Sequence, residues 1–141
     1  MTELEIMQQR HSVRQYADMP IEQDKRTVLN ELAEKLNADA GVHIQIIYDE
    51  PKCFDSFMAH YGKFSGVKNY IALVGKKSPS LDEALGYCGE QLVLKAQELG
   101  LNTCWVAMTH ILQRFFLFSH GFLFRCGLNF SRGSSLRPSP L

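Results

Sequence analysis

The strongest constraint on the fold is a long amphipathic helix predicted between Ser80 and Gly100. Ser80 and Glu83 have the spacing of a capping box, and Gly100 stands where glycine commonly ends a helix. Apolar residues recur between them at helical spacing and give the helix one face to bury: Leu81, Ala84, Leu85, Cys88, Leu92, Ala96 and Leu99. Such a face needs a sheet or other helices to pack against.

Three segments have the composition of strands and supply that partner. We predict strands at residues 42–48, 69–74 and 103–108, the first from its alternation of apolar and polar residues. Helices are predicted up to Gln9, where Thr2 and Glu5 form another capping box, at residues 21–36, and for a short stretch at 51–60. The predicted fold class is α+β, with a central antiparallel or mixed sheet flanked by helices.

Charge is distributed unevenly along the 141 residues, although the formal net charge is zero. Residues 1–110 hold 11 basic and all 15 acidic residues, whereas residues 111–141 hold four arginines, no lysine and no acid. The second segment also contains six of the nine phenylalanines and keeps neither a helical nor a strand period. We therefore expect a domain at 1–110 and a divergent Phe/Arg-rich tail at 111–141 that forms no regular element.

The composition also limits the compartment and the partners. Four cysteines are irregularly spaced without a C-x-x-C pair, which favours free thiols over a disulfide framework. The acidic N-terminus lacks the apolar segment of a signal peptide, and no apolar run reaches the roughly 20 residues that span a bilayer. We expect a cytoplasmic protein with no membrane or nucleic-acid partner.

The segment Arg10–Tyr16 concentrates groups that bind anions. Arg10 and Arg14 flank His11 and Ser12 directly after the first predicted helix. A guanidinium matches the geometry of phosphate oxygens, and a serine hydroxyl adds a neutral donor beside it. On residue types alone, a solvated basic turn at the negative end of a helix is the favoured interpretation of this segment, and only a family resemblance reverses that preference.

Two segments together resemble the FMN-dependent nitroreductase family, in particular its shorter members. Arg10–Tyr16 resembles the signature Arg-(Arg/His)-Ser-x-(Arg/Lys)-x-(Phe/Tyr), and Leu99–Trp105 resembles the Leu-Gly-Leu-x-Thr-Cys-Trp type strand that follows a later helix. The resemblance covers about residues 1–109. It implies a nitroreductase-like fold with two more strands and a partner-crossing tail after residue 110. Residues 111–141 match none of these features, so we expect the C-terminal strands to be incomplete here.

The resemblance also implies which residues contact the cofactor. Arg10 and Ser12 are expected at the FMN phosphate and ribityl chain, with His11 contributing mainly through its backbone and Arg14 reaching the ribityl or the pyrimidine edge. Residues after the second motif are expected along one face of the flavin ring, with the Ala107 N–H near flavin N5. A buried core strand is an equally good interpretation of that second group: Trp105, Val106, Ala107 and Met108.

Other chemistry-bearing residues give weaker predictions. Lys63, Ser65, Gly66 and Lys68 precede the second predicted strand, where solvated lysines are the simpler interpretation and an approach to a phosphate the alternative. His43, Cys53 and His60 lack the spacing of metal ligands. The Gly86–Gly89 stretch lies inside a predicted helix and is not a dinucleotide fingerprint.

By resemblance, the chain is an FMN-dependent oxidoreductase that uses NAD(P)H as co-substrate and reduces nitroaromatics, quinones or similar small-molecule acceptors. We expect a homodimer, because the helix at 81–99 also carries Tyr87, Val93 and Leu94 outside its apolar stripe. The family's C-terminal phosphate ligands have no matched position in residues 111–141, which predicts weak catalysis. The alternatives are a non-catalytic flavin- or nucleotide-binding module and a truncated, inactive family member whose tail mediates self-association or membrane adhesion.

Overall fold

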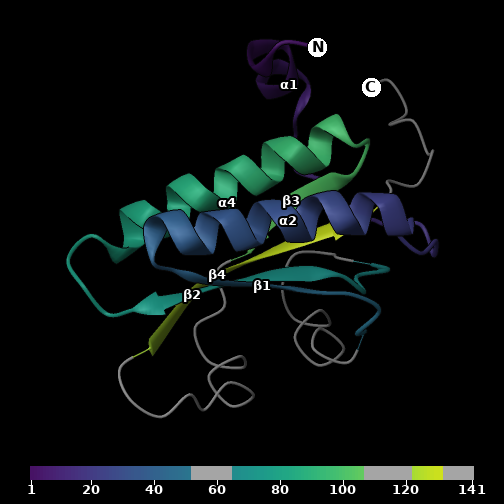
Figure 1. The fold of residues 1–141 in the computed structure, drawn as a ribbon. Coiled ribbons are helices and arrows are strands. Elements are labelled where there is room, and N and C mark those ends of the chain that lie inside the picture. Colours follow the sequence, from purple (N-terminus) through teal and green to yellow (C-terminus); the bar gives the residue numbers. More distant parts are fainter. Residues whose placement is uncertain (52–64, 107–121, 132–141) are drawn as a thin grey trace, which may run out of the picture.

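The computed structural model describes residues 1–51 and 65–106 in full and residues 122–131 as backbone. Figure 1 shows the helices and strands within these ranges. They are α1 (Glu3–Gln9), α2 (Gln23–Ala40), β1 (His43–Ile47), β2 (Tyr70–Lys76), α4 (Leu81–Glu98), β3 (Asn102–Val106) and β4 (Phe122–Ser131).

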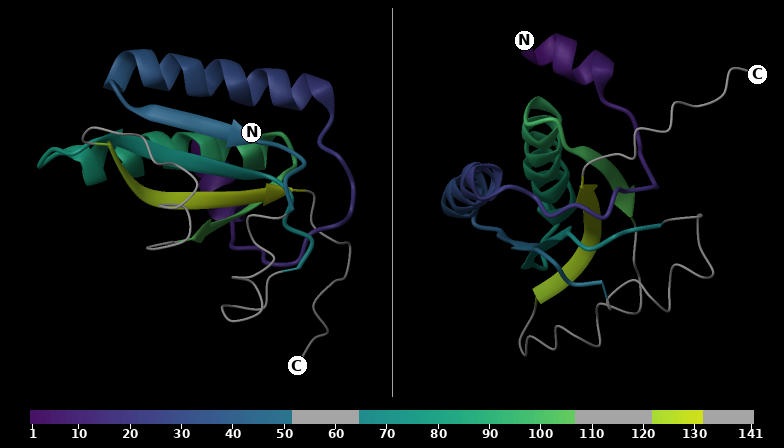
Figure 2. Two further views of the ribbon diagram at one scale, coloured as in Figure 1. Left: turned by 90° about the horizontal axis from the view of Figure 1, so that it is seen from below. Right: turned by 90° about the vertical axis from the view of Figure 1, so that its right-hand side faces the viewer.

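The four strands form one antiparallel sheet in the order β1-β2-β4-β3. Helices α2 and α4 lie side by side over one face of this sheet, and α1 packs on α4 at the margin (Figures 1 and 2). The α+β fold class predicted from the sequence is confirmed. Of the two C-terminal strands that the resemblance implies, one lies within the described residues.

The main hydrophobic core lies between the helices and the sheet. Strand β2 is buried from Tyr70 to Gly75, as expected for an inner strand with a neighbour on each side. The predicted stripe of α4 faces this strand, with Leu85 and Leu92 almost completely buried. Leu29 of α2 completes the layer. Burial of such side chains contributes about 1.5–3 kcal/mol each to the free energy of folding.

The helix ends test the capping predictions. The box at α1 is confirmed, because the Glu5 N–H donates to Thr2 Oγ1 at 3.3 Å and the Thr2 N–H donates to Glu5 Oε2 at 2.7 Å. The box predicted at α4 is wrong: Ser80 is the N-cap residue, but its side chain makes no capping hydrogen bond. Gly100 has φ 74° and donates its N–H to Gln97 O, so it ends α4 as predicted.

The outer edge of β1 is covered by a side chain of α2. Asn37 accepts a hydrogen bond from the Ile44 N–H at 2.6 Å and donates one to the Ile44 carbonyl at 3.0 Å. The amide thus takes the place of a neighbouring strand at one edge residue, and it satisfies backbone groups that would otherwise be available for pairing with another chain.

The prediction that no regular element forms after residue 110 is wrong for β4. This strand lies between β2 and β3, with Ile71 opposite Leu128 and Trp105 opposite the same residue from the other side. Pairing on both edges stabilises a strand that lacks a local periodic pattern, because strand formation depends strongly on tertiary context. The boundary predicted near residue 110 itself falls outside the described residues.

Candidate functional site

The Arg10–Tyr16 segment runs as an extended chain between two other parts of the fold. The Arg10 N–H donates to Ile6 O at 3.0 Å and closes α1. Ser12 then forms a parallel bridge with Thr103 at the start of β3, and the Val13 N–H donates to Thr103 O at 3.1 Å. The two sequence motifs therefore meet in space, as the resemblance implies.

The other end of the segment is held by Ser65, just before β2. Gln15 and Ser65 form a second parallel bridge, in which the Ser65 N–H donates to Arg14 O and the Tyr16 N–H donates to Ser65 O, both at 3.0 Å. The segment is thus fixed by backbone hydrogen bonds on both sides. Fixed backbone positions at the point where a helix ends hold neighbouring side chains in place for a ligand.

Two nitrogen atoms of the Arg10 guanidinium have no hydrogen-bond partner in the described part of the chain. Its Nε and Nη2 atoms are buried and find no hydrogen-bond partner among the residues that the structure describes. A buried charged donor without a partner costs free energy, and an anion that accepts both hydrogen bonds would recover it. The planar Nε–Nη2 edge of arginine suits two oxygens of one phosphate or carboxylate.

The side chains of His11, Ser12 and Arg14 lie exposed beside Arg10 in the sequence. His11 Nδ1 is 3.1 Å from the Gln9 carbonyl, so the ring folds back on the end of α1. The segment therefore combines two buried Arg10 nitrogen atoms that have no partner in the described residues with accessible polar side chains, a donor set that suits an anionic ligand.

Tyr16 ends the segment as a buried anchor. Its side chain is 6% exposed, and burial raises the pKa of the Tyr16 hydroxyl above its usual range, with a further increase from nearby Cys104 and an opposing effect from Arg10. These electrostatic couplings place Tyr16, Arg10 and Cys104 in one neighbourhood. The first and last members of the N-terminal motif are thus close to the second motif.

The second predicted group is only partly within the described residues. Trp105 donates its indole N–H to Glu90 Oε2 of α4 at 3.1 Å, and its ring lies against Gly89 of the same helix. Val106 is buried in β3. Ala107 and Met108, including the N–H expected near flavin N5, lie outside the described residues. The described contacts of Trp105 are those of a packed strand residue, and cofactor contact from this group stays a prediction.

The described residues of the loop before β2 contact other parts of the chain itself, whereas the sequence suggested solvated lysines or an approach to a phosphate. Lys68 forms an ion pair with Asp18, so its described partner is a carboxylate of the chain itself. Lys63 lies outside the described residues. Ser65 and Gly66 contact the Arg10–Tyr16 segment through backbone atoms. In the sequence, only the glycine residue type indicates a close backbone approach.

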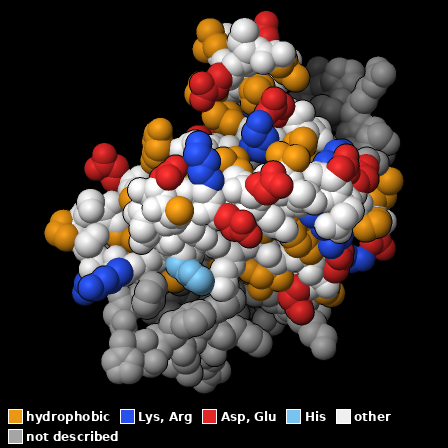
Figure 3. Space-filling model, in the orientation of Figure 1, with side chains coloured by type: hydrophobic (Ala, Val, Ile, Leu, Met, Phe, Trp, Pro, Cys, Tyr) orange, Lys and Arg blue, Asp and Glu red, His pale blue; other side chains and the backbone are white. Residues whose placement is uncertain are grey.

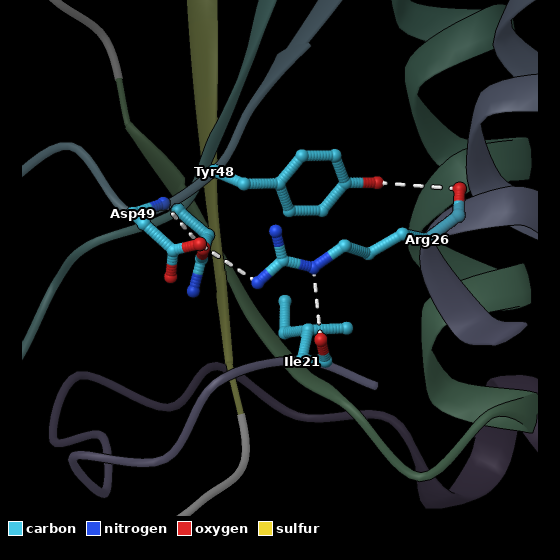
Figure 4. A network of polar contacts seen from close by, with 5 residues as sticks. Ile21, Arg26, Tyr48 and Asp49 are labelled. Carbon is cyan, nitrogen blue, oxygen red and sulfur yellow. Dashed lines mark hydrogen bonds and ion pairs between the residues drawn. The ribbon is translucent and has the colours of Figure 1, made fainter. Parts of the chain in front are cut away.

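A polar network that the sequence analysis did not predict supports the loop after Tyr16. Arg26 of α2 donates from Nε to Ile21 O and from Nη2 to Asp49 Oδ2, both at 2.8 Å, and lies over the Tyr48 ring (Figure 4). The Tyr48 hydroxyl donates to Asn30 Oδ1 at 3.1 Å. The network ties the start of α2 to the end of β1.

Possible metal ligands and possible membrane-spanning helices are two further features on which the described residues bear. Among residues 1–51 and 65–106, His, Cys, Asp and Glu side chains form no group of three that would hold a metal ion. Cys53 and His60 lie outside these ranges. None of the described helices has both the length and the apolar character needed to cross a bilayer.

The visible outer face of α2 and α4 carries interspersed acidic and basic side chains (Figure 3).

Comparison with known proteins gives a family and a fold. A family described as "Putative TM nitroreductase" matches residues 3–118, and no curated protein matches the chain. An FMN-dependent nitroreductase from Clostridium difficile R20291 superposes with a TM-score of 0.80 at 15% identity, over 98% of this chain and 91% of that one.

Two further solved structures have the same fold as this chain. A nitroreductase family protein from Clostridium difficile 630 gives a TM-score of 0.79 at 19% identity, over 99% of this chain and 88% of its own. A protein from Desulfovibrio desulfuricans, described as a putative nitroreductase in complex with FMN, gives 0.74 at 21% identity, over 99% and 92% of the two chains. At these identities the likeness shows a shared fold.

Proposed function

Because the chain belongs to the nitroreductase family, we propose that it is an oxidoreductase that binds FMN at the Arg10–Tyr16 segment. The family and the fold support oxidoreductase activity. The observation that carries the FMN assignment is the half-buried Arg10 side chain, whose buried Nε and Nη2 atoms have no hydrogen-bond partner in the described residues. The phosphate of FMN is an anion of the right geometry to accept both hydrogen bonds.

Each side chain of the segment has a proposed task. Arg10 holds the phosphate, and the exposed Ser12 hydroxyl donates to the phosphate or the ribityl chain. Arg14 supplies a cation toward the ribityl or the pyrimidine edge, where positive charge favours the reduced flavin. When bound, FMN supplies the redox chemistry, and the protein supplies binding, orientation and electrostatics. His11 contributes through its backbone.

The proposed co-substrate is NAD(P)H, and the proposed acceptors are nitroaromatics, quinones or similar small molecules. A ping-pong order, in which the nicotinamide leaves before the acceptor enters, explains why the chain needs no separate dinucleotide fold. The Gly86–Gly89 stretch lies within α4, away from any strand-to-helix turn, and is therefore no dinucleotide-binding loop.

We also propose a homodimer, with a different surface from the one that the sequence favoured. Val93 and Leu94 of α4 are buried within the chain and offer no surface to a partner, so of the three residues that favoured an α4 interface only Tyr87 is exposed, at 71%. Exposed apolar side chains instead gather on α1, where Leu4 is 63% and Met7 49% exposed, and hydrophobic side chains are visible on this helix in Figure 3. Apolar surface of this kind commonly marks an association site.

The test uses the purified full chain. It should carry a flavin absorption spectrum after reconstitution with FMN and should oxidise NAD(P)H with menadione as the acceptor. A flavin spectrum without NAD(P)H oxidation would favour the non-catalytic binding module. No bound flavin at saturating FMN would contradict the proposed function itself.

A further inference from the structure

Gly66 lies against the backbone of the Arg10–Tyr16 segment more closely than any residue with a side chain can. A Cβ built on Gly66 would stand 2.4 Å from the Tyr16 carbonyl oxygen and 3.2 Å from the carbonyl carbon. Gly66 also has φ +71°, in the left-handed region that glycine tolerates best. Two independent features thus require glycine at this position.

The Tyr16 carbonyl has little freedom to move away. The Tyr16 N–H is hydrogen-bonded to Ser65 O, and the Tyr16 side chain is buried. On the other side of Gln15, the Ser65 N–H holds the Arg14 carbonyl, and the Val13 N–H is held by Thr103 O. A displaced Tyr16 carbonyl would therefore shift the backbone that carries Arg14.

The displacement would also reach Arg10. Tyr16 lies within electrostatic range of the Arg10 guanidinium, the group whose Nε and Nη2 lack a partner in the described residues. Because the Tyr16 ring is buried and electrostatically coupled to the half-buried Arg10, we expect a shift of the Tyr16 backbone to change the surroundings of the guanidinium. Misplacement by even 1 Å is enough to weaken a preorganised site strongly.

We propose that Gly66 is a positioning residue for the anion site of Arg10 and Arg14, acting through the backbone of Tyr16. The inference rests on the proposed FMN function and adds to it a residue outside both motifs. The close approach of Gly66 sets the path of the Arg14–Tyr16 chain. The described contacts of Ser65 with this segment are made by main-chain atoms, so we expect its side chain to be dispensable.

Gly41 offers a matched control for Gly66→Ala. It has φ +64°, but a Cβ added there meets nothing within 4 Å. Gly41→Ala therefore carries the backbone strain of a positive φ without the contact on Tyr16. The pair Gly66→Asn and Gly41→Asn repeats the comparison with the residue that best tolerates this conformation after glycine.

The experiment titrates each purified full-length variant with FMN by fluorescence quenching and records the visible circular dichroism of the flavin at saturation. We expect Gly66→Ala and Gly66→Asn to raise the Kd for FMN at least about tenfold, a loss of about 1.4 kcal/mol, and to change the dichroism of the bound flavin. The Kd for FMN of Gly41→Ala, Gly41→Asn and Ser65→Ala should stay within about twofold of the parent value, a difference too small to indicate a lost contact.

Three outcomes overturn the proposal. Equal Kd values and equal flavin dichroism for the Gly66 and Gly41 variants would show that Gly66 does not position the site, while the FMN function stands. Gly66 variants that do not fold, beside folded Gly41 variants, would assign Gly66 to the stability of the fold instead. A parent chain that binds no FMN removes the proposed function and this role together.

Discussion

The indole N–H of Trp105 donates to the Glu90 carboxylate at 3.1 Å, and the same indole ring packs on Gly89 of α4. A Cβ on Gly89 would stand 2.5 Å from Trp105 Cη2 and 2.9 Å from Leu73 Cδ1. The helix can therefore approach β3 at this point only because it carries glycine there. The hydrogen bond fixes the ring, so the ring cannot swing aside to make room.

Gly89→Ala should consequently destabilise the protein by about 1–3 kcal/mol, the usual cost of overpacking a core. Gly86→Ala is the matched control on the same helix, because a Cβ there meets nothing within 4 Å. It should stabilise the protein by about 0.5–1 kcal/mol through the higher helix propensity of alanine. Urea unfolding measures both free energies. Two changes of the same sign would contradict the described packing of Trp105 on α4.

The burial of Tyr48 predicts a dependence of stability on alkaline pH. Burial raises the pKa of Tyr48 to about 12, against a partial lowering by Arg26. In the unfolded chain a tyrosine ionises near pH 10, so the unfolded state releases its proton first as the pH rises. The contribution of Tyr48 to stability is complete below pH 10 and is lost as the pH approaches about 12.

Tyr48→Phe should therefore reduce the fall in unfolding free energy between about pH 10 and pH 12. The buried Tyr16, whose pKa is also raised by burial, keeps part of the fall in this variant. Tyr87→Phe changes a side chain that is 71% exposed and serves as the control. A Tyr48→Phe profile that runs parallel to the profiles of the parent and the control would show that Tyr48 is not held in its described environment.

The exposed apolar residues of α1 predict where the homodimer forms. Replacing Leu4 and Met7 together by glutamine should shift the protein toward the monomer in sedimentation experiments, because the interface loses buried apolar surface. Met19→Gln is the control, since Met19 is similarly exposed outside α1. A dimer that survives the double substitution undiminished would exclude α1 from the interface, and a parent that is monomeric throughout would exclude the dimer.

Local patterns were sufficient to predict the described helices and the strands β1, β2 and β3 from the sequence. The α1 capping box, the stripe of α4 and the helix end at Gly100 depend on residues a few positions apart, and each produces a legible spacing. The long-range contacts produce no such spacing. Strand β4 forms because β2 and β3 pair with it, and its own residues have no alternating pattern that would predict a strand.

The same distinction applies to the candidate site. The residue types of Arg10, Ser12 and Arg14 allowed either an anion site or a solvated basic turn, and the resemblance favoured the anion site and named FMN as the anion. The bridge between Ser12 and Thr103, which brings the two motifs together, joins residues 91 positions apart and has no local signature. Gly66 was visible only as a glycine in a loop, because the carbonyl that requires it belongs to a distant segment.

The central claim is that the unsatisfied guanidinium of Arg10 holds an anion, and Arg10→Gln tests it by two measurements. Removal of a buried charge without a partner should leave the apo-protein as stable as the parent or more stable. FMN binding should nevertheless weaken, because charge-assisted hydrogen bonds of about 1.5–3 kcal/mol are lost. His11→Ala is the control, since His11 is expected to contribute through its backbone.

The deciding measurement is the Kd for FMN of parent, Arg10→Gln, Arg14→Gln and His11→Ala, each titrated as folded apo-protein by fluorescence quenching. We predict an increase of at least about tenfold for Arg10→Gln, or about 1.4 kcal/mol, a smaller increase for Arg14→Gln, whose side chain is exposed, and no change for His11→Ala. An Arg10→Gln protein that binds FMN as tightly as the parent would contradict the account.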